Sequence, residues 1–183
     1  MKIRQLGDPI LRQKSLAVGR DEFQTHEIDS VIQTLKQVLD GIKAISDENG
    51  NALSAPQIGK LKRIIMLRID GVFTPMINPV IIDASDEMFD FVEECFSFYN
   101  LRATVQRYKQ INVQFQNEDG RVKQITVSGE MSGLIQHEID HLDGIFFLDH
   151  VKKENNIASV DYILKDNPQR LKVVRKMMDY MVS

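Results

Sequence analysis

The sequence predicts an α+β fold in which a mostly antiparallel β-sheet packs around a central helix, with further helices near both ends of the chain. Three observations lead to this prediction: an amphipathic helical pattern near the start, several strand-like segments in the middle, and helical patterns again after residue 130. A chain of 183 residues suits one domain with a substantial core. We therefore expect residues 1–183 to form a single domain.

The first predicted helix spans residues 25–45, where apolar residues recur at steps of three and four. We interpret the shared face of these residues as part of the core. Asp47, Asn49 and Gly50 then predict the end of the helix and the start of a loop. The residues of the apolar face are Ile28, Val31, Ile32, Leu35, Val38, Leu39, Ile42 and Ile45.

The middle of the chain is predicted to be β-structure. Three segments have strand-like apolar content, and two later ones alternate apolar and polar residues. The sequence Asn-Glu-Asp-Gly at 117–120 predicts a hairpin turn between the last two. The five predicted strands are residues 63–69, 76–82, 88–98, 111–115 and 122–127.

Two further helices are predicted in the last third of the chain. Residues 130–142 can form one helix, with Gly144 as its C-terminal stop. Residues 145–148 follow as a short buried segment. Pro168 suits the first turn of a last helix that runs to about Met181 and carries an apolar, methionine-rich side, which we interpret as core packing.

The composition argues against several classes of function. The formal net charge is -3, so no excess positive field favours direct nucleic-acid binding, although a local patch near the ribosome stays open. No apolar run approaches the ~20 residues needed to span a bilayer. Residues 1–20 lack the apolar centre of a secretion signal. We expect a cytoplasmic protein without membrane contact, and a monomer as the simplest assembly.

The strongest chemical signal is the sequence His-Glu-Ile-Asp-His at 137–141. Histidines four residues apart lie one turn apart on the same face of a helix, so the imidazoles of His137 and His141 can bind one metal ion. Glu138 follows the first of them, and its carboxylate can reach a water bound to that metal. The pattern indicates a metal-dependent hydrolase.

A catalytic site of this kind usually has three protein ligands. One protease class has a third histidine where this chain has Phe147, which cannot bind a metal, so that class is excluded. Glu154 is a weak candidate in a polar stretch close to His141. Cys95, the only cysteine of the chain, is the better candidate, because a thiolate with two imidazoles suits iron(II), zinc, nickel or cobalt.

Three motifs in this order resemble the peptide deformylase family. They are the glycine-rich loop ending in Pro-Gln at 50–57, Glu-Glu-Cys-Phe-Ser at 93–97, and Gln-His-Glu-Ile-Asp-His at 136–141. Weaker similarities lie at 8–12 and 143–144. The helix motif alone would also fit a metalloprotease, whereas three motifs in order are specific.

The resemblance implies an amidohydrolase that removes the N-formyl group from the N-terminal formyl-methionine of newly made polypeptides. Cys95, His137 and His141 would bind one divalent metal ion per chain, with Fe²⁺ as the native ion and Zn²⁺, Ni²⁺ or Co²⁺ as alternatives. A metal-bound water would then be the nucleophile, because a metal lowers its pKa from ~15.7 toward ~7.

The same resemblance implies roles for further residues. Glu138 would be the general base and then the general acid, and the Gln57 amide and the Phe96 backbone N–H would stabilise the oxyanion. Apart from the resemblance, we interpret Asp140 and Glu93 as groups that orient the metal ligands, with Arg107 as their charge partner; ordinary buried ion pairing is the alternative. The methionine pocket would lie between the loop at residue 50 and the histidine helix. The expected substrate-binding residues are Gly50, Asn51, Ala52, Leu53, Glu93, Glu94, Arg102, Gly133 and Leu134.

Several residues depart from the family pattern. Glu94 replaces a glycine, where a positive φ would strain it and its charge would lie near the metal. Ala52 and Ser54 replace a glycine and an alanine of the first motif. Glu130 and Gly133 stand about where apolar residues usually line the methionine pocket, and if they line it here, the pocket is wider and more acidic. A second hypothesis therefore stays open, a deformylase-like metal-binding protein with altered substrate preference or reduced activity.

Overall fold

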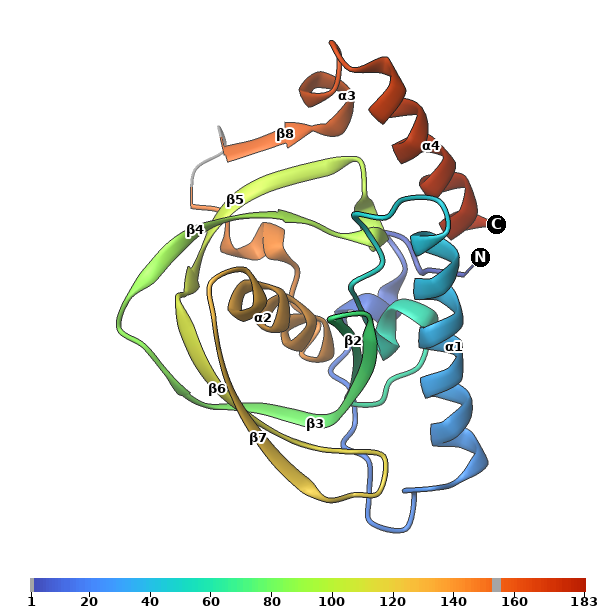
Figure 1. Cartoon of the computed structure of the whole chain (residues 1–183), viewed down its shortest axis with the longest axis vertical. Helices are drawn as coiled ribbons and strands as arrows, with labels where there is room; N and C mark the ends of the chain where they lie inside the picture. Colours follow the sequence, from blue (N-terminus) through green and yellow to red (C-terminus); the bar gives the residue numbers. More distant parts are fainter. Residues whose placement is uncertain (1, 153–155) are drawn as a thin grey trace.

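The structure, a computed structural model, describes residues 2–152 and 156–183. Two antiparallel sheets surround the helix that carries the histidines, and the other helices come from the first and last parts of the sequence (Figure 1). The predicted α+β class is confirmed.

Four α-helices and eight strands make up the described fold, together with four short 3₁₀ turns at Pro9–Arg12, Ala55–Ile58, Phe96–Phe98 and Phe147–His150. The α-helices are α1 (His26–Lys43), α2 (Glu130–Leu142), α3 (Val160–Ile163) and α4 (Pro168–Val182). The strands are β1 (Ala52–Ser54), β2 (Ile64–Ile69), β3 (Val72–Ala84), β4 (Met88–Glu94), β5 (Leu101–Tyr108), β6 (Gln110–Gln116), β7 (Val122–Ser128) and β8 (Ile157–Ser159).

The strands form two sheets. The larger has the order β1-β2-β3-β6-β7 and the smaller the order β4-β5-β8, and every pairing of these named strands is antiparallel. The predicted hairpin turn joins β6 to β7, where the Asn117 N–H donates to the Arg121 carbonyl at 3.0 Å and Gly120 takes a φ of 76°. That positive φ is one glycine adopts without strain.

Helix α2 lies at the centre of the molecule, between the two sheets (Figure 1). Its apolar residues Ile135, Ile139 and Leu142 pack against the larger sheet. Gln136 fixes the helix to β5, because its side chain accepts from the Tyr108 N–H at 3.1 Å and donates to the Tyr108 carbonyl at 3.0 Å. The opposite face of α2 is thereby turned toward β4 and the cysteine that follows it.

Helices α1 and α4 pack against each other and cover the other side of the core. The predicted apolar face of α1 is buried from Ile28 to Ile42, while Ile45 lies past the end of the helix and is partly buried. A Cβ at Gly41 would come within 1.8 Å of the Tyr180 hydroxyl, so only glycine allows this close contact with α4. Val174, Met177 and Met181 are buried, which confirms the core role predicted for that side of α4.

The predicted strand at 88–98 is too long, because β4 ends at Glu94 and Phe96–Phe98 form a 3₁₀ turn. Strand β5 was not predicted. Its buried positions are Ala103, Val105 and Arg107, so an arginine interrupts the apolar alternation by which a strand is recognised. The strands β1 and β8 have three residues each, and α3 four, which is too short for any periodic pattern.

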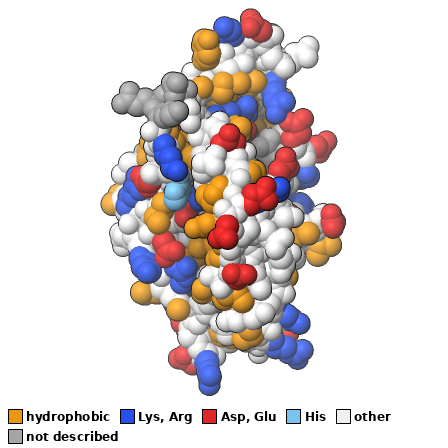
Figure 2. All heavy atoms as spheres, turned by 90° about the vertical axis from the view of Figure 1, so that its left-hand side faces the viewer, with side chains coloured by type: hydrophobic (Ala, Val, Ile, Leu, Met, Phe, Trp, Pro, Cys, Tyr) orange, Lys and Arg blue, Asp and Glu red, His pale blue; other side chains and the backbone are white. Residues whose placement is uncertain are grey.

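None of the described helices combines the length and apolar character needed to cross a membrane. On the face shown in Figure 2, the described Lys and Arg side chains are dispersed among acidic and hydrophobic ones.

Candidate metal centre

Cys95, His137 and His141 meet in the interior, where one potential ligand atom from each lies within 4.8 Å of the others. The Cys95 Sγ is 3.2 Å from the His141 Nε2, and all three side chains are buried. Helix α2 supplies the histidines from adjacent turns, and Cys95 follows directly after the last residue of β4. The predicted ligands are therefore brought together, whereas Glu154 lies outside the described residues.

The donor set fits a divalent transition metal, because sulfur and imidazole nitrogen are ligands that such ions prefer. Burial, followed by the positive charges of His137 and Arg107, lowers the pKa of His141 well below its usual value, so its imidazole is neutral and offers a lone pair. Burial also acts to lower the pKa of His137, but hydrogen bonds to Cys95 and Glu93 outweigh it and raise that pKa well above its usual value. Without a metal, the contacts of His137 with Cys95 and Glu93 thus favour a positive charge on its imidazole.

A buried network orients His137 from behind. The Glu93 Oε2 lies 2.5 Å from the His137 Nδ1, which leaves Nε2 for a metal. Arg107 holds Glu93 through two nitrogens, at 2.5 Å and 3.1 Å, and binds the Asp140 Oδ2 at 2.6 Å. The His150 Nε2 lies 2.8 Å from the same Asp140 oxygen, and no motif in the sequence predicts this contact.

Glu138 is buried beside the metal ligands, and burial raises the pKa of its carboxyl group. The Ser54 hydroxyl donates a hydrogen bond to the Glu138 carboxylate, and its oxygen also lies 3.2 Å from the Glu138 carbonyl oxygen. From the sequence, Ser54 was notable only because it replaces an alanine of the family pattern. Its hydroxyl in fact fixes the Glu138 side chain.

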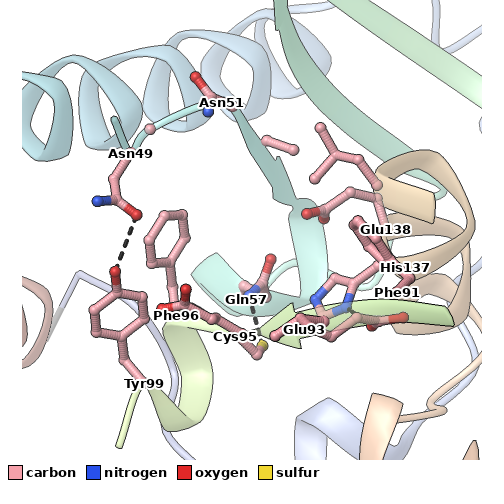
Figure 3. A pocket seen from close by; sticks show the side chains of 15 residues that line it. Asn49, Asn51, Gln57, Phe91, Glu93, Cys95, Phe96, Tyr99, His137 and Glu138 are labelled. Atoms are coloured by element: carbon pink, nitrogen blue, oxygen red, sulfur yellow. Dashed lines mark hydrogen bonds and ion pairs between the residues drawn. The ribbon is translucent and has the colours of Figure 1, made fainter. Parts of the chain in front are cut away.

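Gln57 is buried on the other side of the ligands. Its Oε1 accepts from the Ser54 N–H at 3.0 Å, which directs Nε2 toward the Cys95 Sγ at 3.6 Å and the Ser97 Oγ at 3.2 Å. Figure 3 shows the Gln57 amide directed at the sulfur. The Gln57 side chain can therefore donate a hydrogen bond at the metal centre.

A cavity of about 190 Å³ opens at the metal centre, and Cys95, His137, Glu138, Gln57 and Phe96 are among its lining residues. Of the expected substrate-binding residues, six line this cavity and three do not: Leu53 is buried in the core, Gly133 lies behind Phe91, and Arg102 borders a neighbouring cavity. The six are Gly50, Asn51, Ala52, Glu93, Glu94 and Leu134. Four further residues that the sequence did not indicate also line the cavity: Asn49, Phe91, Val92 and Tyr99.

Gly133 and Glu130 do not line the cavity, so the condition for a wider and more acidic pocket is not met. A Cβ at Gly133 would come within 2.6–2.9 Å of the Phe91 ring, so this ring already fills the space that a larger side chain would occupy. Glu130 is not among the residues that line the cavity. Phe91 comes from β4, far from Gly133 in the sequence, and only the fold brings the two together.

The predicted strain at Glu94 is also absent. The described non-glycine residues with positive φ are Gln24, Asp70 and Asn78, and Glu94 lies at the end of β4 in extended backbone. Glu94 is paired in register with Arg102 of β5, and their side chains form an ion pair at 2.8 Å. The negative charge of Glu94 near the metal centre is therefore offset by an arginine.

Comparisons with known proteins agree with this site. The family model for polypeptide deformylase matches residues 1–156. The peptide deformylase of Picosynechococcus sp. is 33% identical over 182 residues, covering 97% of this chain and 91% of its own length. That of Dictyoglomus turgidum is 35% identical over 158 residues, covering 86% of this chain and 97% of its own.

Solved structures show the same fold. A peptide deformylase from Synechococcus elongatus in complex with actinonin superposes with a TM-score of 0.75 at 27% identity, covering 91% of this chain and 85% of its own. A Met-Ala-Ser-bound peptide deformylase from Acinetobacter baumannii gives a TM-score of 0.72 at 24% identity, covering 81% and 96%. Together with the Cys95, His137 and His141 cluster, these matches show that the chain belongs to the peptide deformylase family and is a hydrolase with a Cys-His-His metal site.

Proposed function

We propose that the protein removes the formyl group from the N-terminal formyl-methionine of newly made polypeptides. The observation that supports this most is the convergence of three metal ligands, a buried carboxylate and a side-chain amide donor on one cavity. Met-Ala-Ser, the peptide bound by the Acinetobacter relative, is the product that formyl-Met-Ala-Ser would give. The cytoplasm, where polypeptides are made, is the compartment that suits this function.

Cys95, His137 and His141 would hold the metal, which we propose is Fe²⁺ in the native protein, with Zn²⁺, Ni²⁺ and Co²⁺ compatible with the same ligands. When bound, a divalent ion acts as a Lewis acid and lowers the pKa of water. Glu93 keeps His137 in the orientation that presents Nε2 to the ion. The chain's own residues supply the remaining steps.

Glu138 moves the protons. It lines the cavity next to His137, and the Ser54 hydroxyl holds its carboxylate in place. In the proposed reaction Glu138 takes a proton from the attacking water and then delivers it to the nitrogen of the new amino terminus as the C–N bond of the formamide breaks. Formate and the free amine are the products.

Gln57 and Phe96 stabilise the oxyanion that forms on the formyl oxygen. The Gln57 Nε2 is directed at the ligand cluster, and Phe96 begins a 3₁₀ turn, where a backbone N–H has no partner within the turn itself. Such a donor typically contributes ~2.7–4 kcal/mol to lowering the barrier. Both donors act on negative charge that develops only as the formyl carbon becomes tetrahedral.

Part of the cavity wall is apolar and suits a methionine side chain. Phe91, Val92 and Leu134 provide apolar surface beside the metal ligands. We propose that this surface takes the methionine side chain, while residues 50–52, which also line the cavity, contact the peptide backbone.

The test is formate release from formyl-Met-Ala-Ser by protein purified without oxygen and loaded with Fe²⁺ or Ni²⁺. We expect hydrolysis of the formyl-peptide, no cleavage of the unformylated peptide Met-Ala-Ser, and loss of formate release in Glu138→Ala with its metal content unchanged. Folded, metal-loaded protein that releases no formate would contradict the proposed function. Cleavage of the unformylated peptide would instead indicate a protease.

A further inference from the structure

A second cavity, of about 560 Å³, adjoins the cavity at the metal centre. Asn49, Glu94 and Tyr99 line both cavities, and the Tyr99 hydroxyl donates to the Asn49 Oδ1 at 2.9 Å. Figure 3 shows Asn49 and Tyr99 on the side of the first cavity away from His137 and Glu138. The space therefore continues from the metal centre, past Glu94, toward α4.

Glu94 and Arg102 form the ion pair at this boundary. The Arg102 Nη2 lies 2.8 Å from the Glu94 Oε1. The second carboxylate oxygen of Glu94 and the Nε of Arg102 are buried and have no hydrogen-bond partner among the described residues. The guanidinium is thus held by a carboxylate of the chain itself, and a second anion would have to compete with Glu94 for it.

The charged residues of the second cavity leave an excess of one negative charge. Its lining contains the carboxylates of Asp47, Glu48 and Glu94 and the guanidiniums of Arg102 and Arg170. Both arginines are in ion pairs, since Arg170 binds Glu48 at 2.9 Å. An anionic group that enters this space meets carboxylates, and both cations are already paired.

We propose that Glu94 is a specificity-determining residue that selects against a free carboxylate placed a few residues after the formyl-methionine. This inference rests on the proposed function, which puts the formyl group at the metal centre; the adjoining second cavity then offers the rest of the peptide a path past Glu94. Glu94 acts in two ways: it repels the carboxylate, and it occupies the arginine that would otherwise bind it. The favoured substrates are formylated chains that continue as polypeptide, and the disfavoured ones are short formyl-peptides with a free C-terminus.

The experiment compares formyl-Met-Ala-Ser with formyl-Met-Ala-Ser-amide, which differ by the one negative charge. We expect the wild-type protein to favour the amide by about fivefold in kcat/KM, the upper range for a partly exposed charge pair. In Glu94→Gln the ratio should fall to about one or below, because Arg102 is released. In Arg102→Gln it should rise above the wild-type ratio, because Glu94 is left without its cation. High salt should reduce the wild-type ratio.

Glu87→Gln is the matched control. Glu87 forms an exposed ion pair with Lys109 at 2.7 Å and lines neither of the two cavities, so its loss should leave the ratio unchanged. Metal content is measured for every variant, because Glu94 adjoins the ligand Cys95. Equal ratios in the wild type and Glu94→Gln, or a fall in Arg102→Gln, would overturn the inference while leaving the proposed function intact.

If the wild type releases no formate, equilibrium binding tests the role of Glu94 separately from the proposed deformylase function. The two formyl-peptides are then titrated by calorimetry into metal-loaded Glu138→Gln, which is not expected to hydrolyse them, with and without the Glu94→Gln substitution. Tighter binding of the amide that disappears with Glu94→Gln would support the role of Glu94. Equal affinity for both peptides, or a preference unchanged by Glu94→Gln, would overturn it.

Discussion

Two consecutive glutamates of β4 each bind an arginine of β5, yet they lie in different surroundings. The side chains of Glu93 and Arg107 are 1% and 4% exposed, and this pair supports the ligand His137. Those of Glu94 and Arg102 are 30% and 14% exposed, and that pair separates two cavities. The side chains of successive strand residues point to opposite faces of a sheet, so the ion pairs of Glu93 and Glu94 lie on opposite faces.

The comparison shows that a glutamate–arginine pair has a different role when it is buried than when it is partly exposed. A buried ion pair is costly to break, because removing one partner leaves an uncompensated charge in the interior. A partly exposed pair contributes little to stability, because water screens the charges. The inner pair therefore supports folding and metal binding, and the outer pair is available for substrate selection.

The largest expected difference is in stability. Arg107→Met leaves the buried Glu93 and the partly buried Asp140 without the guanidinium that binds both, and should lower the free energy of unfolding by about 3–5 kcal/mol. The matched substitution Arg102→Met, at the outer pair, should cost about 1 kcal/mol or less. Urea unfolding of the metal-free, reduced proteins measures both. Equal losses would show that burial does not separate the two pairs.

Metal affinity should separate the glutamates. Glu93→Gln removes the negative charge that orients His137 and should weaken metal binding by about 10- to 100-fold. Glu94→Gln, one residue closer to Cys95 in sequence, should leave metal affinity within about twofold, because its side chain contacts Arg102 and no ligand. Competition with a chromophoric chelator gives both constants. A larger loss of metal affinity in Glu94→Gln than in Glu93→Gln would contradict the assignment of Glu93 as the residue that supports the metal site.

The smallest effect on stability is expected for an ion pair at the surface. The side chains of Arg12 and Asp149 are 49% and 41% exposed, and the hydrogen bond from Arg12 lowers the pKa of Asp149. A lowered folded-state pKa contributes stability above the unfolded value and loses it as the pH falls through the folded value. Asp149→Asn should therefore cost at most about 1 kcal/mol at pH 7 and progressively less below about pH 4. A cost that stays constant down to pH 2 would contradict this origin.

The parts of the fold that could be predicted are those with local signals. Helices α1, α2 and α4 carry apolar periodicity, and the β6–β7 turn has its own sequence pattern. The strand β5 was missed because Arg107 stands at a buried position, and its partners Glu93 and Asp140 lie elsewhere in the chain.

The metal ligands were predictable because two of them share a helix face and the third is the only cysteine. The pocket wall was not. Gly133 suggested an open space, because nothing in the sequence shows that the Phe91 ring packs against it. Glu94 suggested backbone strain, because the sequence does not show that this residue pairs with Arg102 in an extended strand. Contacts between distant segments decide the shape and charge of this site.

Formate release during an anaerobic titration of the metal-free protein with Fe²⁺ is the most direct test of the central claim, that Cys95, His137 and His141 hold one catalytic metal. With formyl-Met-Ala-Ser in excess, the rate should rise in proportion to added Fe²⁺ and level off at one ion per chain. Cys95→Ser should lose this response. Formate release that needs no metal, or none at one bound ion per chain, would contradict the claim.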